Sequence, residues 1–568
     1  MSSHSLTDST VLSQNELVPK RQPKSSLFWL TFLSILVCIF LTALDLTAVP
    51  TALPTITNDL HGGDKFIWIG SAYGLASSAV LLLSGRLADI FGRKPVLLTS
   101  IAVFASGSAV AGASQNMGML IAARVVQGVA GGSLLNVSEI VISDLVPLAE
   151  RGIYQGMIVL AYAVASGVGP VIGASLSQNA SWRWLFYLNL PLTGLAFALV
   201  STFLRVRSPR GSICHKLLRV DWIGNSLMAA GSTLALLGLT WGGIQYPWDS
   251  AHVLAPLAIG FVIMAAFFVY EIYVPEELTL PLEVIANRTS VAGCAKSPLC
   301  AVLLRANRIY ECGFLATFVH GITSIAAIYY LPTYFQACFV ASPLRSSVQT
   351  LPTALVMPPF SLLCGFVVKA TRTYRPINVV GWILSIIGFG LLSLLQADSA
   401  APQWIGFQFL MSAGTGIIYA STVFAVLAPL PVSRNAAALG FFMFCRTFAQ
   451  TWGITISGTI LQNQLKSQLP PAFTAQFPSG VEIAYAAIPL IPTLDEPLRT
   501  EVREAFAGSM TIIWKTMVGL CGAGILTLFL LKEVPMVTHT DEAYGLREDL
   551  RSSATDAASV QVGISKSA

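Results

Sequence analysis

Charged side chains are scarce in this chain. Asp, Glu, Lys and Arg make up 11% of its 568 residues, whereas a typical soluble domain holds about 25%. Hydrophobic residues make up 54%, and the mean hydropathy is +0.69. This composition excludes a soluble globular protein and indicates a protein that crosses a membrane many times. The small net charge of +5 gives no indication of a nucleic-acid partner.

Motifs for cofactors and catalysis are also missing. The nine cysteines are spread singly apart from Cys294, Cys300 and Cys312, and they follow neither zinc-site spacing nor a secreted disulfide framework. No G-x-x-x-x-G-K-[ST] phosphate-binding loop occurs, which argues against an ATP-driven pump. No nucleophile, base and orienting group stand in a recognisable arrangement. The sequence therefore predicts no enzyme, no cofactor and no metal site.

Long apolar runs dominate the sequence instead. A helix of about 20 apolar residues spans the hydrocarbon core of a bilayer, and only helices or closed barrels satisfy the backbone there. Fourteen such runs lie at about 27–49, 66–84, 95–113, 118–141, 155–177, 184–204, 222–242, 253–272, 313–335, 348–369, 377–396, 403–428, 436–460 and 509–531. The expected fold is all-α, a polytopic membrane protein with 14 transmembrane helices.

Basic residues in the predicted loops lie mostly on one side of the membrane. That side includes the hairpin Gly85–Pro95 and the basic segment 205–219. The first 26 residues are polar and lack the short apolar core and cleavage site of a secretory signal. Because Lys and Arg accumulate in cytoplasmic loops, we expect the hairpin and both termini in the cytoplasm. We favour the plasma membrane over the vacuolar membrane.

The chain contains a weak internal repeat. The hairpin GRLADIFGRKP at Gly85 aligns with GFVVKATRTYRP at Gly365, with Lys369 where the first half has Asp89. Related halves are common in transporter folds, so we expect two six-helix bundles with two inserted helices. The expected domains are a cytoplasmic N-tail at 1–26, a first bundle at 27–204, a linker with the inserted spans at 205–272, a cytoplasmic loop at 273–312, a second bundle at 313–531 with an external loop at 461–508, and a cytoplasmic C-tail at 532–568.

Several short motifs occur in order along the chain. The hairpin after the second span carries Gly85, Leu87, Asp89, Gly92, Arg93 and Lys94. The first span carries Leu44, Asp45, Thr47, Ala52, Leu53 and Pro54, and the fourth carries Arg124, Gln127 and Gly128. With these motifs the chain resembles the fourteen-span fungal drug:proton antiporters of the major facilitator superfamily. The span 5 signature of that family is only partly kept, with alanines at Ala161, Ala165 and Ala174 where glycines are usual.

Asp45 and Arg124 are the first candidate functional residues. A carboxylate inside a span is costly unless it faces a polar cavity or takes a proton. Arg124 lies at a similar depth in its own span, so the two can meet, and a guanidinium favours the ionised carboxylate. We interpret the pair as the proton-coupling site. The alternatives are a fixed ion pair that holds two helices together and, for Asp45, a structural hydrogen bond.

The resemblance also implies a gate that closes the cytoplasmic side. Its candidate residues are Gly85, Asp89, Gly92, Arg93, Lys94, Asp144 and Arg151. Asp144 and Arg151 are expected in a loop after span 4, and a solvated loop pair is their alternative. Gly169, Pro170 and Gly173 predict a kink in span 5 because proline lacks the N–H donor; tight helix packing is the alternative.

A substrate cavity would be lined by the few polar and aromatic groups within the spans. The candidates are Tyr162, His320, Tyr329, Gln408, Tyr419, Arg446 and Gln450. Packing or interfacial roles are the common alternative for such residues. Glu139, fifteen residues past Arg124, is expected near the cytoplasmic end of span 4 as an interfacial charge. These residue types suit an amphipathic organic substrate.

The sequence thus predicts a secondary active transporter, a proton-coupled exporter of small amphipathic organic compounds or drugs that works by alternating access. A siderophore or other small-molecule uptake or exchange carrier is the alternative, and a non-transporting membrane sensor is a third. Expected partners are the substrate, protons and the lipid bilayer, with no nucleic acid and a monomeric state. The segment 294–312 departs from the family pattern, and we interpret it as an insertion or retained intron, with an ordinary longer loop as the alternative.

Overall fold

The computed structural model describes residues 24–60, 67–206, 212–243, 246–274, 308–430, 434–474, 476, 483–530, 533, 534 and 536. These residues form helices and connecting turns, and no β-strand occurs among them. Residues 294–307 of the proposed insertion lie outside the described residues, and so do 1–23 of the N-tail and 537–568 of the C-tail.

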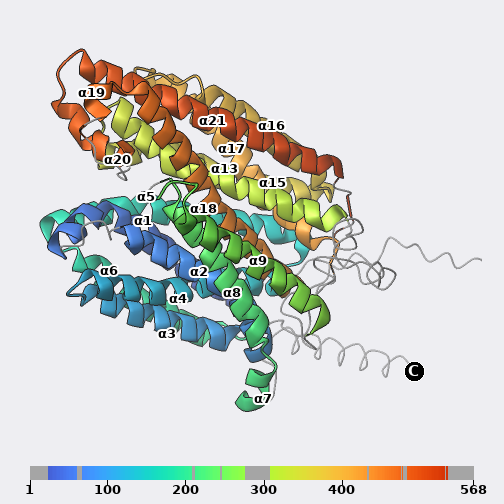
Figure 1. The fold of residues 1–568 in the computed structure, drawn as a ribbon. Coiled ribbons are helices and arrows are strands. Elements are labelled where there is room, and N and C mark those ends of the chain that lie inside the picture. Colours follow the sequence, from blue (N-terminus) through green and yellow to red (C-terminus); the bar gives the residue numbers. More distant parts are fainter. Residues whose placement is uncertain are drawn as a thin grey trace, which may run out of the picture.

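Six long helices form the first bundle (Figure 1). They are α1 (Ser26–Asp59), α2 (Ile67–Phe91), α3 (Arg93–Gly112), α4 (Met117–Leu145), α5 (Leu148–Asn179) and α6 (Arg183–Phe203). The turn from α2 to α3 passes through Gly92 at φ 98°, a conformation that suits glycine because it has no Cβ. The Asn116 side chain caps α4 by accepting from the Met119 N–H at 2.8 Å.

Six further long helices form the second bundle. They are α13 (Arg308–Cys338), α15 (Leu351–Thr371), α16 (Arg375–Leu392), α17 (Ala401–Leu427), α18 (Asn435–Gln468) and α21 (Leu498–Leu530). The short elements are α7 (Ile213–Leu218), α14 (Pro343–Gln349), α19 (Pro471–Thr474), α20 (Ile483–Ala487) and η3 (Ile488–Thr493). The turn from α15 to α16 again contains a positive φ, at Arg372 (59°).

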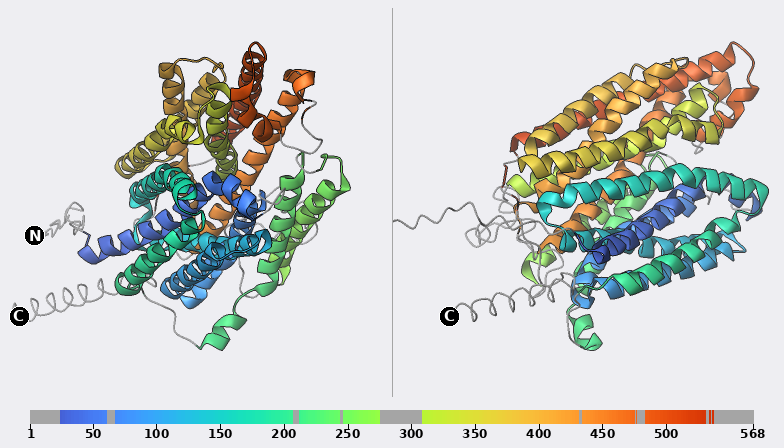
Figure 2. Two further views of the ribbon diagram at one scale, coloured as in Figure 1. Left: turned by 90° about the vertical axis from the view of Figure 1, so that its left-hand side faces the viewer. Right: turned by 180° about the vertical axis from the view of Figure 1, so that it is seen from behind.

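Two long helices remain, α8 (Trp222–Trp241) and α9 (Ala251–Tyr273). In the sequence they lie between the first and the second bundle. They pack on each other, and α8 also packs against α2 and α18. Figure 2 shows this green pair beside both bundles. The predicted fold is confirmed: two six-helix bundles with an inserted pair.

The described residues contain thirteen helical segments that are long and apolar enough to cross a membrane. The fourteenth long helix, α18, is not among them; it carries Arg446 and Gln450 near its middle. Several helices are longer than their apolar runs, because backbone hydrogen bonding continues beyond the hydrocarbon core. The predicted first span at 27–49 belongs to a helix that ends at Asp59. The predicted external loop at 461–508 contains the last residues of α18 and the first residues of α21.

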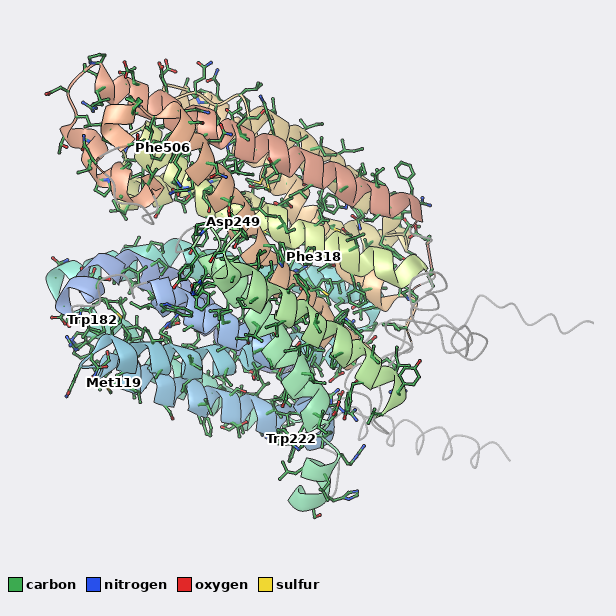
Figure 3. The ribbon with its side chains drawn as sticks, in the orientation of Figure 1. Met119, Trp182, Trp222, Asp249, Phe318 and Phe506 are labelled. Carbon is green, nitrogen blue, oxygen red and sulfur yellow. The ribbon has the colours of Figure 1, made fainter. Side chains whose placement is uncertain are left out.

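The two bundles meet mainly through α5 with α15 and α2 with α18. A Cβ on Gly152 of α5 would lie 2.7 Å from the Cα of Gly365 of α15, so only glycines allow this backbone approach. Figure 3 shows the bundles further apart near Trp182 and Phe506, and the reversed view in Figure 2 agrees. We call the two ends of the molecule the Gly92 end and the Trp182 end.

Candidate functional site

Asp45 lies inside the first bundle and is 3% exposed. Its carboxylate accepts from Arg124 Nη1 of α4 at 2.5 Å and from Asn189 Nδ2 of α6 at 2.9 Å. Gln127 Nε2, also on α4, lies 3.4 Å away. The structure therefore brings the predicted pair together, 79 residues apart in sequence, and holds the carboxylate with donors from two other helices.

Arg124 is 1% exposed and is held from several sides. Its Nε donates to the Ile69 carbonyl of α2 at 3.1 Å, and Nη1 also donates to Gln127 Oε1 at 2.9 Å. The guanidinium carbon lies 4.6 Å from the centre of the Tyr73 ring, within the range of a cation–π contact. Buried charges are stable only when they are paired and hydrogen-bonded in this way.

The local sequence of α4 explains why this network forms. Arg124 and Gln127 are three residues apart, which places them on one helix face. On the same helix, a Cβ on Gly132 would lie 2.6 Å from the Ser77 carbonyl oxygen of α2. Small residues thus let α2 and α4 approach closely.

Arg93 is the centre of the predicted gate and is 2% exposed. It forms ion pairs with Asp89 at 3.0 Å and with Asp144 at 2.8 Å, and its Nη1 donates to the Ala88 carbonyl at 2.9 Å. These contacts join the end of α2, the start of α3 and the end of α4. Lys94, the next residue, donates to the Ser201 carbonyl of α6 at 2.6 Å.

The prediction that Asp144 and Arg151 lie in a loop is wrong. Asp144 belongs to α4 and Arg151 to α5, and they are 5% and 2% exposed. The turn between them is only Val146 and Pro147, because the helices extend beyond the apolar runs. Arg151 Nη2 donates to the Ser143 carbonyl at 2.8 Å, whereas Asp144 is paired with Arg93.

Two other features of the Gly92 end connect the bundles. Lys369 of α15 forms an ion pair with Glu150 of α5 at 3.6 Å, and the side chains are 29% and 15% exposed. A Cβ on Gly85 of α2 would lie 3.3 Å from Asn136 Nδ2 of α4 and 3.7 Å from the Ala436 carbonyl oxygen at the start of α18. Gly85 therefore lies where α2, α4 and α18 pack together, and an added Cβ would press only slightly on the Asn136 side chain.

Pro170 lies inside α5, which runs unbroken from Leu148 to Asn179. Beside it, a Cβ on Gly169 would lie 3.1 Å from the Cβ of Thr47 on α1. Thr47 Oγ1 also donates to the Ala165 carbonyl at 3.4 Å. Gly169 thus allows α5 to pack closely on α1 at Thr47, which lies two residues after Asp45. The kink expected at Pro170 and Gly173 stays a prediction.

Three of the cavity candidates gather in the second bundle. Arg446 of α18 is 6% exposed, and its guanidinium carbon lies 3.9 Å from the Tyr419 ring centre and 4.5 Å from the Phe442 ring centre. His320 of α13 is 1% exposed, lies 6.3 Å from the Tyr419 ring centre, and has its Nε2 3.1 Å from the Thr415 carbonyl oxygen. Tyr162 of α5 packs inside the first bundle against Ala43, Leu44 and Ala165.

The other cavity candidates lie elsewhere. Gln408 of α17 accepts from Thr353 Oγ1 at 2.9 Å and donates to the Gln349 carbonyl at 3.1 Å. Tyr329 of α13 is 44% exposed, and Gln450 is half-buried in α18. The cluster at Arg446 therefore contains His320 and Tyr419, whereas in the described part of the chain no ring contact joins it to Tyr162 or to these three residues.

Glu139 was expected as an interfacial charge, and that expectation is wrong. It is 4% exposed and accepts a hydrogen bond from Gln155 Nε2 of α5. A carboxylate in an apolar run with no Lys or Arg within four residues was the available signal. Asn189, the donor to Asp45, was also missed as a site residue.

The comparisons with known proteins identify the family. A family model described as the Major Facilitator Superfamily matches residues 35–454, so the chain belongs to this superfamily of membrane transporters. It is an integral membrane transporter and not an enzyme, as predicted.

Its relatives are fungal transporters. The chain is 35% identical to "Efflux pump FUS6" of Gibberella moniliformis, covering 94% of this chain and 92% of that protein. It is 37% identical to "MFS-type transporter gkaD" of Penicillium citrinum, covering 96% and 92%. It is 36% identical to the "Acurin A biosynthesis cluster MFS-type transporter" of Aspergillus aculeatus, covering 94% and 93%.

Solved structures show the same fold. The human organic anion transporter MFSD10 (TETRAN) matches with a TM-score of 0.56 at 14% identity, covering 89% of this chain and 100% of that one. A double Trp mutant of XylE matches with a TM-score of 0.54 at 13% identity, covering 90% and 97%. At these identities the match concerns the arrangement of helices alone.

Proposed function

We propose that this transporter exports small amphipathic organic compounds in exchange for protons, by alternating access of a site between its two bundles. The observation that carries the proposal is the Asp45–Arg124 pair at 2.5 Å inside the first bundle. Efflux is the direction named for FUS6, a relative that matches nearly the full chain.

The chemistry of the pair explains how a proton could be taken up and released. An ionised carboxylate without a partner is costly in a low-dielectric interior. Asp45 is therefore stable as an anion while Arg124 and Asn189 are in place. A rearrangement of α1 against α4 that separates Asp45 from Arg124 favours proton binding, and re-formation of the pair favours release.

The gate residues fit a closed conformation of the Gly92 end. Arg93 holds α2, α3 and α4 together through Asp89 and Asp144, while Lys369 and Glu150 link the bundles. We propose that this end is cytoplasmic, with both termini on the same side, and that the protein works as a monomer in the plasma membrane. Separation of α5 from α15 would then open the site toward the cytoplasm.

The residues near Arg446 determine which kind of substrate the proposed site suits. Tyr419, Phe442 and His320 offer aromatic surface, and Arg446 offers hydrogen-bond donors. Stacking surface with a few polar groups suits an amphipathic organic molecule. These residues come from α13, α17 and α18, and we propose that Tyr162 of α5 completes the site from the first bundle, so movement between the bundles changes it.

The test uses the purified full chain in proteoliposomes with an imposed proton gradient and a fluorescent amphipathic dye as the probe. We expect gradient-driven dye movement that Asp45→Asn abolishes. Asp59→Asn is the matched control, because Asp59 ends the same helix and pairs with Arg183 at 2.9 Å with 47% of its own side chain exposed. Dye movement that is equal with and without the gradient contradicts the proposal. Uptake of an iron chelate instead would assign the alternative carrier function.

A further inference from the structure

Glu139 stands where the two bundles meet. It lies six residues before the end of α4 in the first bundle. Asn136, one turn earlier on α4, faces α18 of the second bundle, because a Cβ on Gly440 would lie 3.6 Å from Asn136 Nδ2. Residues three apart share a helix face. Glu139 is thus buried in the first bundle, one turn beyond the point where α4 meets α18.

The charged and titratable groups around Glu139 come from both bundles. Arg151 of α5 and Arg446 of α18 both attract its carboxylate, and Tyr419 of α17 also interacts with it. Gln155 of α5 donates its hydrogen bond. No ion pair within 4.0 Å holds Glu139 among the described residues. Arg151 and Gln155 belong to the first bundle, so Arg446 is the cation through which the opposite bundle contributes to stabilising the Glu139 anion.

Arg446 is a buried cation whose hydrogen-bond donors are only partly used. It is 6% exposed, and its Nη2 donates to the Tyr419 carbonyl at 3.3 Å, whereas Nε and Nη1 have no hydrogen-bond partner among the described residues. A buried guanidinium with unpaired donors is costly. A nearby carboxylate reduces that cost, so each of the two charges stabilises the other.

Asp45 differs from Glu139 in this respect. The hydrogen-bond donors to Asp45 all belong to the first bundle, on α4 and α6. A rigid movement of one bundle against the other leaves these partners together, so proton exchange at Asp45 requires the separate movement of α1 against α4 proposed above. The same movement separates Glu139 from Arg446, which lie on different bundles.

We propose that Glu139 is a second proton-binding site, at the junction of the bundles, and that its ionised form helps to hold the Gly92 end closed through Arg446. The proposal rests on the proposed function in assuming that the bundles move. Protonation removes the charge that Arg446 attracts, which favours opening. By linkage, opening removes Arg446 from the carboxylate, which favours proton binding.

The test measures the distance between the bundles at the Gly92 end by double electron–electron resonance, without any substrate. The full chain is first freed of its nine cysteines. Spin labels are then attached at Thr202, near the end of α6, and at Thr371, at the end of α15; both residues are exposed. We expect the distance distribution to shift toward longer values from mildly alkaline to mildly acidic buffer. Glu139→Gln should give the longer distances in both buffers and lose the pH dependence.

Two control variants separate Glu139 from other acids. Glu150→Gln breaks the link to Lys369 between the bundles, so it should favour longer distances in both buffers but keep the pH dependence; a loss of the pH dependence in this variant would assign it to Glu150 and contradict the proposal. Asp45→Asn should also keep it, because Asp45 is held within one bundle. If Glu139→Gln does not fold, Arg446→Gln tests the pair from the opposite side and should favour the longer distances.

Three further results would overturn the proposal. In the first, the wild-type distance does not change with pH. In the second, the Glu139→Gln protein keeps the wild-type pH dependence. In the third, Asp45→Asn removes the pH dependence while Glu139→Gln keeps it. Because the measurement involves no transport, it decides the role of Glu139 even if the dye assay shows no proton coupling. Conversely, proton-driven dye movement without a change at Glu139→Gln rejects only this inference.

Discussion

The contact between Gly152 and Gly365 gives the sharpest prediction about alternating access. A Cβ on Gly365 would strike the backbone of Gly152 and Ile153 on α5. Backbone atoms cannot rotate away as a side chain can, so α5 and α15 must separate. Overpacking of this kind costs about 1–3 kcal/mol. In the proposed cycle this contact exists only while the Gly92 end is closed, so Gly365→Ala should destabilise that state by this amount.

A penalty of about 1–3 kcal/mol corresponds to a change of about 5- to 150-fold in the ratio of open to closed states. The spin-label pair at Thr202 and Thr371 reports this ratio as the area of the longer-distance peak. Gly390→Ala on α16 is the matched control, because a Cβ on Gly390 would have no neighbour within 4 Å. If both variants give the wild-type distribution, the closed contact of α5 with α15 does not govern opening.

Two more predictions concern side chains. Arg93→Ala leaves Asp144 buried without its cation, so we expect a loss of about 3–5 kcal/mol of stability, measured as a lower melting temperature in detergent. Arg183→Ala, which breaks a pair of half-exposed side chains, should cost no more than about 1 kcal/mol, and equal losses would contradict the burial argument. Tyr419→Phe should retain dye transport because the ring over Arg446 remains, whereas Tyr419→Ala should reduce it; equal transport by both would remove the ring from the site.

The fold could be predicted because apolar length and basic loops are local signals. Each span of about 20 apolar residues requires a helix in a bilayer. The meeting of Asp45 with Arg124 also followed from their similar depth in two spans. Depth says nothing about rotation around the helix axis, and for that reason Asn189 was missed as the third member of the site.

Burial by neighbouring helices could not be read from the sequence. Counting residues along α4 placed Glu139 near the end of its helix but could not show that its side chain is buried and bonded by Gln155 of α5. The same limit applies to Tyr329 and Gln408, whose direction is set by packing against other helices. Asp144 and Arg151 were placed in a loop because apolar runs end before the hydrogen-bonded helices do.

Proton coupling through Asp45 is the central claim, and substrate-driven proton movement tests it most directly. Proteoliposomes with the full chain and a pH-sensitive dye trapped inside receive an outward gradient of a neutral amphipathic compound, with no proton gradient imposed. We predict proton movement opposite to the substrate in the wild type and in Asp59→Asn, and none in Asp45→Asn. Substrate movement without proton movement in the wild type, or unchanged proton movement in Asp45→Asn, would contradict the claim.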